Sequence, residues 1–350
     1  GLGTDGKKNS LPQLLSEGRC YHTGMSEVTE KILVIINPNA GPYGATQKAE
    51  RLCKALKASG AFVQSRATQG IGHARDIVSQ EASHYDLVVA CGGDGTFSEV
   101  VSGLMRLDTP PDVGFLPVGS TCDIARNFRL PSHPKKAAHV MLKGIAYPLD
   151  IGRVTGSVPE LRDDLPEGVV PDETALLPDH FSYVTSFGAF SETSYATRRE
   201  LKKTLGHFAY VLTGLQSVPH IHPVETKVIL DGDDYSGAYI FGGVLNSYSV
   251  GGMVKIDQVS FNDGLFEVLL VKPPKNVGQI AHLLSLLLRR KAGDAIIRRR
   301  AREVIFEFPD KVSFTIDGEY GGSRDLWRIE NIQRAIRLRV AEPPQKAILP

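Results

Sequence analysis

The sequence predicts an α/β N-terminal domain with a parallel sheet, followed by a C-terminal β-sandwich domain. Up to about residue 148, short apolar runs alternate with segments of helical periodicity, and this alternation is typical of βαβ units. From residue 149 onward, strand-like segments dominate and two helical stretches interrupt them. A chain of 350 residues is long enough for two separate cores. We therefore predict domains over residues 31–148 and 149–345, and the end of the second is a candidate to return to the first.

Local patterns place the elements of the first domain. Apolar, partly β-branched runs predict buried strands at residues 31–36, 61–67, 85–90 and 113–118. Helical spacing predicts helices over 45–59, 73–80 and 95–107, with a short helix after residue 121. Three of these strands end in loops rich in Gly, Ser and Thr. Because the carboxyl ends of strands in an open α/β sheet line the ligand site, these loops are the first candidates for binding residues.

The second domain is predicted from its alternating segments. Strands are expected at residues 181–187, 224–230, 239–246, 265–271, 304–308 and 312–316, and helices at 192–217 and 276–301. The second helical stretch carries an apolar stripe and then a basic run, residues 289–302. Two interpretations stay open. The arginines either lie on the solvated face of a packed helix or form a basic face for an anionic bilayer, where each cation contributes about 1 kcal/mol.

Composition sets the broad class of protein. Lys and Arg total 40 and Asp and Glu total 39, so the charge balance predicts no nucleic-acid partner. The four cysteines form no CxxC pair, so no zinc site or disulfide framework is expected, and reduced cysteines favour a cytoplasmic location. No apolar run is long enough to span a bilayer. Residues 1–30 are polar and are predicted to be a tail or extension outside the fold.

A glycine-rich loop, Cys91-Gly92-Gly93-Asp94-Gly95-Thr96, joins the strand at 85–90 to the helix that follows. Successive glycines allow backbone to approach a ligand closely, and a helix N-terminus favours an anion. Asp94 suits a Mg²⁺ ion that accompanies phosphates. The alternative is a plain strand–turn–helix corner with Asp94 as a cap. Neither a Walker A loop nor a dinucleotide GxGxxG fingerprint is present.

Separated motifs across the chain form an ordered set. They are Asn37-Pro38-Asn39-Ala40-Gly41, Gly92-Gly93-Asp94-Gly95-Thr96, Pro117-Val118-Gly119-Ser120-Thr121-Cys122-Asp123, Asn262-Asp263-Gly264-Leu265 and Asp317-Gly318-Glu319. This set resembles the diacylglycerol kinase family of lipid kinases, which includes soluble bacterial members and the sphingosine and ceramide kinases. The resemblance covers residues 31–340. It departs at Ser120 and Cys122, where most members carry Thr and Asn.

The resemblance implies a NAD kinase/diacylglycerol kinase-like first domain, with ATP and Mg²⁺ bound between the domains. The implied nucleotide contacts are Asn37, Pro38, Asn39, Ala40, Gly41, Thr68, Gly93, Asp94, Gly95, Thr96, Phe97, Ser98, Glu99 and Ser120. The implied catalytic residues are Glu319 as base, with Asp317 beside it, and Asp94. Asp94, Asp123 and Asp150 match an acidic network around metal-bound phosphates. Ser260, Asp263 and Leu265 match a structural metal site.

The chemistry of phosphoryl transfer fits these residue types. It requires positioning, metal charge and a group that orients the nucleophile, and a carboxylate can accept the proton of a lipid hydroxyl. Taken alone, Asp317-Gly318-Glu319 and Asn262-Asp263-Gly264 are also ordinary turn sequences. We expect an ATP- and Mg²⁺-dependent kinase for a diacylglycerol-like or sphingoid lipid hydroxyl. The alternatives are a NAD kinase-like enzyme and a non-catalytic lipid- or nucleotide-binding protein. Transient contact with an anionic membrane surface is expected, and homodimerisation is left open.

Overall fold

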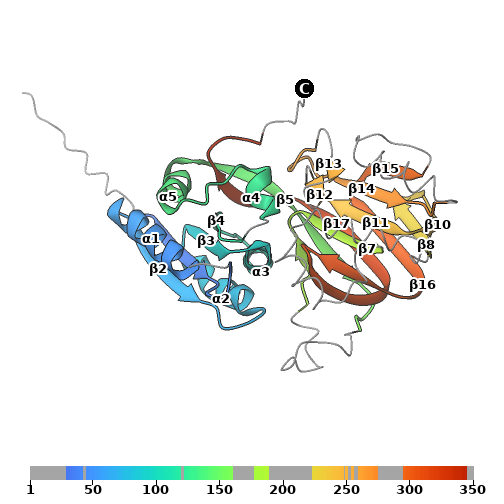
Figure 1. The fold of residues 1–350 in the computed structure, drawn as a ribbon, viewed down its shortest axis with the longest axis horizontal. Coiled ribbons are helices and arrows are strands. Elements are labelled where there is room, and N and C mark those ends of the chain that lie inside the picture. The colour runs from blue at the N-terminus through green and yellow to red at the C-terminus, as the bar shows by residue number, and fades with distance from the viewer. Residues whose placement is uncertain are drawn as a thin grey trace, which may run out of the picture.

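The computed structural model describes residues 29–41, 45–119, 122–160, 177–188, 223–247, 249–250, 254–255, 259–274 and 295–344. Two parts are visible in Figure 1: a blue-to-green part with helices around a sheet, and a yellow-to-red part dominated by strands. Among these residues, 15 strands are joined in one mixed sheet. The predicted fold class, a parallel α/β region followed by a strand-rich region, is therefore confirmed.

The N-terminal part is a parallel sheet with helices on both faces. Its strands are β1 (Lys31–Ile36), β2 (Phe62–Ala67), β3 (Leu87–Gly92) and β4 (Asp112–Pro117), in the order β4-β3-β1-β2. Its helices are α1 (Ala45–Ala58), α2 (His73–Glu81), η1 (Ala82–His84), α3 (Asp94–Leu104), α4 (Asp123–Asn127) and α5 (Pro134–Lys143). Alternate residues of β1 and β3 pack on α1 and α5 on one face and on α2 and α3 on the other.

The C-terminal part is built from short strands and three long ones. Its elements are β5 (Ile145–Gly156), β6 (His180–Phe181), β7 (Val184–Gly188), β8 (Val224–Leu230), β9 (Asp233–Asp234), β10 (Gly237–Tyr239), β11 (Phe241–Leu245), β12 (Ser249–Val250), β13 (Val254–Lys255), β14 (Phe266–Val271), β15 (Ile296–Ala301), β16 (Glu303–Ile316) and β17 (Glu319–Val340). An aromatic cluster fills its core, in which the rings of Phe314 and Trp327 stack at 4.1 Å. Neither α5 nor β5 was predicted from the sequence.

Strand β17 connects the two parts of the molecule (Figure 1). Its first half forms a hairpin with β16, and its second half pairs with β5 and, at Leu338, with Val113 of β4. Arg337 and Arg339 of β17 both bind the buried carboxylate of Asp112 at the start of β4. The last strand is thus anchored to the N-terminal sheet by backbone pairing and by two charge-assisted hydrogen bonds.

The helix predicted over residues 276–301 is wrong at its end. Residues Ile296–Ala301 form strand β15, which pairs antiparallel with β14. Strand alternation explains the arginine run, because Arg298 and Arg300 face Glu267 while Arg299 lies over the ring of Tyr235. The rest of that prediction, the helix at 192–217 and most of the tail at 1–30 lie outside the described residues.

Smaller differences concern the ends of elements. The strands predicted at 304–308 and 312–316 are one strand, β16, interrupted by irregular register. Helix α3 ends at Leu104, three residues before the predicted end. In the part of the chain that the structure describes, no helix combines the length and the apolar character needed to cross a membrane.

Candidate active site

The glycine loop lies where β3 ends at Gly92 and α3 begins at Asp94, with Gly93 as the N-cap. Gly92 has no room for a side chain, because a Cβ there would lie 2.3 Å from the Thr96 Oγ1. A Cβ on Gly93 would meet no atom within 4 Å, so the outer side of the loop is open. The backbone N–H groups at the start of α3 therefore border space in which an anion can bind.

A second loop, after β1, is tied to the glycine loop through Asn37. The Asn37 Nδ2 donates a hydrogen bond of 3.0 Å to the Thr96 Oγ1, and the Asn37 backbone N–H donates one of 3.0 Å to the Cys91 carbonyl. Gly41, at φ +72°, packs so closely that a Cβ would lie 2.8 Å from the carbonyl oxygen of Val118. The predicted loops after β1, β3 and β4 are therefore brought together, while Ser120 lies outside the described residues.

The first turn of α4 contacts the glycine loop through two acidic residues. The backbone N–H of Asp123 donates a 3.3 Å hydrogen bond to the Asp94 Oδ2. Asp123 itself is buried, with 5% of its surface exposed. Neighbouring Cys122 has its pKa raised to about 12, mainly by burial and then by the charge of Asp94. Its thiol stays protonated at neutral pH, so it is not a nucleophile here.

Asp317 and Gly318 form the two-residue turn of the β16–β17 hairpin. Their φ values are +48° and +84°, as a type I′ turn requires, and the turn pairs Ile316 with Glu319. The buried Asp317 carboxylate accepts four hydrogen bonds of 2.8–3.1 Å. The donors are the backbone N–H groups of Ser182, Tyr183 and Val184 and the Ser182 hydroxyl. Burial raises the pKa of Asp317 to about 6, against these hydrogen bonds, which lower it.

Glu319 lies directly against the glycine loop. A Cβ built on Gly95 would be 3.1 Å from the Glu319 Oε1, so the hairpin turn and the start of α3 are in contact. The arrangement leaves two different acids in one turn. Asp317 has its carboxylate held inside the protein, whereas Glu319 is exposed beside the N-terminus of α3.

Tyr183 is a site residue that the sequence did not reveal. Its buried hydroxyl donates a 2.8 Å hydrogen bond to the carbonyl oxygen of Asp317. Burial raises the pKa of Tyr183, and so do the charges of four nearby carboxylates, those of Asp94, Asp317, Asp123 and Glu319. Acids from both parts of the molecule therefore surround one phenol. The available signal was a tyrosine within the predicted strand at 181–187, because the hydroxyl of a buried tyrosine needs a partner. In the structure Tyr183 lies between β6 and β7.

Several predicted nucleotide contacts have other roles for their side chains. Phe97 is fully buried, and its ring lies 4.9 Å from that of Phe115. The Glu99 carboxylate accepts hydrogen bonds from the backbone N–H groups of Gly72 and Ala74 at the start of α2. Thr68 is buried, and its backbone N–H donates to the Ile36 carbonyl. Phe97, Glu99 and Thr68 therefore support the loops from the interior of the protein.

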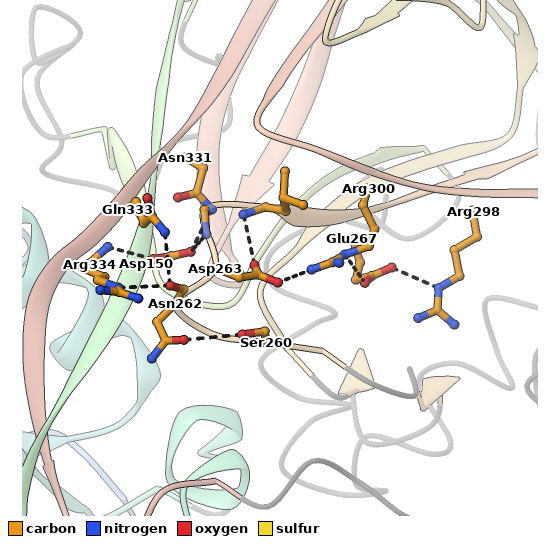
Figure 2. Close-up of polar contacts among 12 residues, drawn as sticks. Asp150, Ser260, Asn262, Asp263, Glu267, Arg298, Arg300, Asn331, Gln333 and Arg334 are labelled. Atoms are coloured by element: carbon orange, nitrogen blue, oxygen red, sulfur yellow. Dashed lines mark hydrogen bonds and ion pairs between the residues drawn. The ribbon is translucent and has the colours of Figure 1, made fainter.

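Asp150 and Asp263 form a separate polar cluster in the strand-rich part (Figure 2). The fully buried Asp150 carboxylate accepts hydrogen bonds of 2.7 Å from the backbone N–H groups of Gly264 and Arg334, and one of 3.3 Å from the Asn331 amide. Burial nevertheless raises its pKa. Asp150 therefore holds the turn at 262–264 against β17, and both oxygens of its carboxylate are engaged in these hydrogen bonds.

The glycine loop of the α/β part and the hairpin turn of the strand-rich part together fit a kinase that is built from two parts. The family "Diacylglycerol kinase catalytic domain" matches residues 31–154. A diacylglycerol kinase of Bacillus subtilis (strain 168) is 31% identical over 294 residues, covering 83% of this chain and 89% of the relative. One from Staphylococcus carnosus (strain TM300) is 26% identical, covering 83% and 88%. The crystal structure of a diacylglycerol kinase from Bacillus anthracis str. Sterne matches the fold with a TM-score of 0.71 at 24% identity, covering 89% and 97%. This chain belongs to the diacylglycerol kinase family of lipid kinases.

Proposed function

We propose that this protein transfers the γ-phosphate of ATP to the hydroxyl of a diacylglycerol-like lipid, with Glu319 as the general base. The observation that carries this proposal is the contact between Glu319 and Gly95. An exposed carboxylate therefore lies beside the N-terminus of α3. If the phosphates of ATP bind there, an acceptor hydroxyl has to approach the γ-phosphate next to Glu319. Family membership and the names of the relatives support the lipid acceptor.

The N-terminal loops would hold the nucleotide. The open side of Gly93 leaves room for phosphate oxygens near the N–H groups of α3. Asn37 and Thr96 brace the loop through their side-chain hydrogen bond. Asp94 and Asp123 are adjacent, with the Asp123 backbone N–H 3.3 Å from the Asp94 Oδ2. Their carboxylates are the hard oxygen donors that Mg²⁺ prefers, so these two residues would hold the ion. Such an ion would neutralise charge that develops on the transferred phosphate.

The hairpin turn would handle the acceptor. Glu319 accepts the proton of the lipid hydroxyl, and Asp317 acts as a positioning residue because its four hydrogen bonds fix the turn. Tyr183 adds a fifth hydrogen bond to the same turn, at the Asp317 carbonyl. A base held by buried partners keeps its reach to the hydroxyl constant, which is what general base catalysis requires.

The lipid substrate implies transient contact with a membrane. The basic run suggested by the sequence is a weaker candidate for that contact than expected, since Arg298 and Arg300 form ion pairs with the buried carboxylate of Glu267. Within the described part of that run, Arg299 and Arg302 are the exposed arginines outside these pairs. We therefore expect anionic vesicles to bind the protein with only a small loss when Arg299 is replaced by Ala.

The proposed function is tested by incubating the protein with γ-labelled ATP and separate acceptors, with products identified by mass. The acceptors are dispersed diacylglycerol, sphingosine, ceramide and, for the alternative kinase class, NAD. Label in phosphatidic acid is the expected result. Label in NAD phosphate, or ATP hydrolysis without lipid product under all conditions, would contradict the proposal.

A further inference from the structure

The turn at residues 260–265, predicted above as a structural metal site, is built around an arginine. The Asp263 Oδ1 accepts a 3.2 Å hydrogen bond from the backbone N–H of Leu265, and the Asp263 Oδ2 forms an ion pair with the Nη2 of Arg300 (Figure 2). The Ser260 hydroxyl bonds the Asn262 side chain at 3.4 Å. The one carboxylate of the predicted site is therefore already bound to a cation of the protein.

Strand register explains why Arg300 reaches this turn. Arg300 of β15 lies directly opposite Glu267 of β14, and its Nε is 3.2 Å from the Glu267 Oε1. Arg298, two residues earlier and on the same face, binds the other carboxylate oxygen at 3.0 Å. The Glu267 side chain is 5% exposed, so it keeps Arg300 in place between two carboxylates.

The local charges balance without an added ion. Asp150, Asp263 and Glu267 carry three negative charges, and Arg298, Arg300 and Arg334 carry three positive ones. The nearby Asp150 carboxylate is satisfied by backbone and amide N–H groups.

One carbonyl group of the turn, that of Asn262, is also in use. Gln333 and Arg334 both donate to the Asn262 carbonyl at 3.3 Å. Mg²⁺ keeps several water ligands and binds proteins through one or two carboxylates, whose negative charge has to be uncompensated. The residues present do not fit the predicted ion.

We propose that the guanidinium of Arg300 replaces a divalent cation at this turn, so that the chain carries its own counter-charge for Asp263. The consequence is a strand-rich part whose stability does not depend on Mg²⁺ at this turn. The inference concerns the fold of the turn and is independent of the proposed reaction. Removal of Arg300 leaves the Asp263 carboxylate without its cation, and this uncompensated charge attracts a hydrated Mg²⁺ ion.

The test measures the thermal midpoint without nucleotide, in EDTA and then in excess Mg²⁺, for the whole chain and four variants. Arg300→Met keeps the apolar stem and removes the charge, Asp263→Asn removes the carboxylate, and a double variant combines the two changes. Arg299→Met is the matched control, because it lies on the same strand but faces Tyr235. Mg²⁺ bound elsewhere shifts all five proteins equally, so differences between them report on the turn.

The expected result has three parts. The wild type and Asp263→Asn respond to Mg²⁺ to the same extent. Arg300→Met melts roughly 5 °C lower than Arg299→Met in EDTA. Arg300→Met also regains part of that loss in Mg²⁺, and the double variant Arg300→Met/Asp263→Asn does not.

Three outcomes would overturn the proposal. The first is a Mg²⁺ response of the wild type that Asp263→Asn abolishes, which would place a metal on Asp263. The second is equal midpoints for Arg300→Met and Arg299→Met in EDTA. The third is an Arg300→Met variant that gains no response to Mg²⁺. If Arg300→Met does not fold, the comparison of the wild type with Asp263→Asn decides alone.

Discussion

Two Asp-Gly turns in this chain have nearly the same sequence but opposite surroundings. In Asp317-Gly318 and in Asp263-Gly264, the glycine has a positive φ, +84° and +82° respectively. The Asp317 carboxylate is buried and accepts four hydrogen bonds, whereas Asp263 is exposed and binds the guanidinium of Arg300. The turn motif sets the backbone in both places. The partners set the chemistry, and these come from distant strands.

The difference shows why one turn suits catalysis and the other suits structure. Asp317 uses its carboxylate entirely for holding the turn, and so the next acid, Glu319, projects to the glycine loop with its own position fixed. At the other turn the acid is neutralised by an arginine, and the residue that follows glycine is the apolar Leu265. A paired acid lacks the uncompensated charge that a base needs.

The largest effect is expected from Glu319→Gln, which tests the functional half of the comparison. The amide keeps the size of the side chain but cannot accept the proton of the hydroxyl. We expect kcat to fall by ~10²–10⁴, while the affinity for ATP, measured by calorimetry, stays near that of the wild type because the proposed nucleotide contacts lie in the N-terminal loops. Glu330→Gln, which changes a half-buried acid of the same strand that pairs with Arg153, is the control. Full kcat in Glu319→Gln would remove the base role.

The second prediction concerns pH and Asp317. The pKa of this carboxyl is raised to about 6 in the folded protein, whereas in the unfolded chain it is near 3.9. Between these values the folded state holds a proton that the unfolded state releases, so this group's contribution to the free energy of unfolding falls as pH rises from about 4 to 6. The total change is about 3 kcal/mol for a shift of roughly two units.

Asp317→Asn tests this sign directly, because asparagine does not titrate. Urea unfolding of both proteins from pH 4 to pH 7 should show the wild type losing its stability advantage over the variant as pH rises. An advantage that grows with pH would mean that the four hydrogen bonds outweigh burial. The kcat of the wild type should also fall below about pH 6, since a protonated Asp317 no longer accepts from every donor and the turn loosens around Glu319.

Sequence patterns predicted the elements whose signals are local. The four parallel strands and the glycine loop were found because buried β-branched runs and the position of Gly92–Gly95 between strand and helix are readable from neighbouring residues. The same is true of the turns, where Gly follows Asp. The position of these turns in the molecule was expected from the family resemblance.

The partners of the acids could not be predicted, because they are remote in sequence. Ser182 and Tyr183 lie more than 130 positions from Asp317, and no local pattern points from one to the other. The arginines of β15 were misread as helical, since three consecutive cations carry no periodicity. Which face each arginine occupies depends on Glu267 of β14 and on Tyr235, between β9 and β10.

A smaller effect is expected from Gly95→Ala, which tests the contact between hairpin and loop. The added Cβ would lie 3.1 Å from the Glu319 Oε1, so the carboxylate has to move by a few tenths of an ångström. We expect kcat to fall up to roughly tenfold, since misplacement by 1 Å can cost 10²-fold, with an unchanged thermal midpoint. Gly93→Ala is the matched variant. Its Cβ would face open space, so it should raise the KM for ATP instead, and equal effects on kcat would argue against the contact.

The smallest predicted effect is that of Tyr183→Phe. This variant separates the hydrogen bond to the Asp317 carbonyl from the hydrogen bonds to the Asp317 carboxylate. The variant keeps the ring in its buried place and removes the hydroxyl that donates to the Asp317 carbonyl at 2.8 Å. A typical hydrogen bond of this kind contributes about 1 kcal/mol, so the free energy of unfolding in urea should fall by about that amount. The Asp317 carboxylate still has its four donors, and therefore the turn should persist and kcat should drop only a few-fold.

The double variant Tyr183→Phe/Asp317→Asn tests whether the phenol and the carboxylate act together. Its loss in free energy of unfolding should exceed the sum of the losses of the two single variants, because both groups hold the same two residues. Strict additivity would show that the phenol and the carboxylate stabilise the fold separately, and Tyr183 would then be a core residue with no part in positioning Glu319.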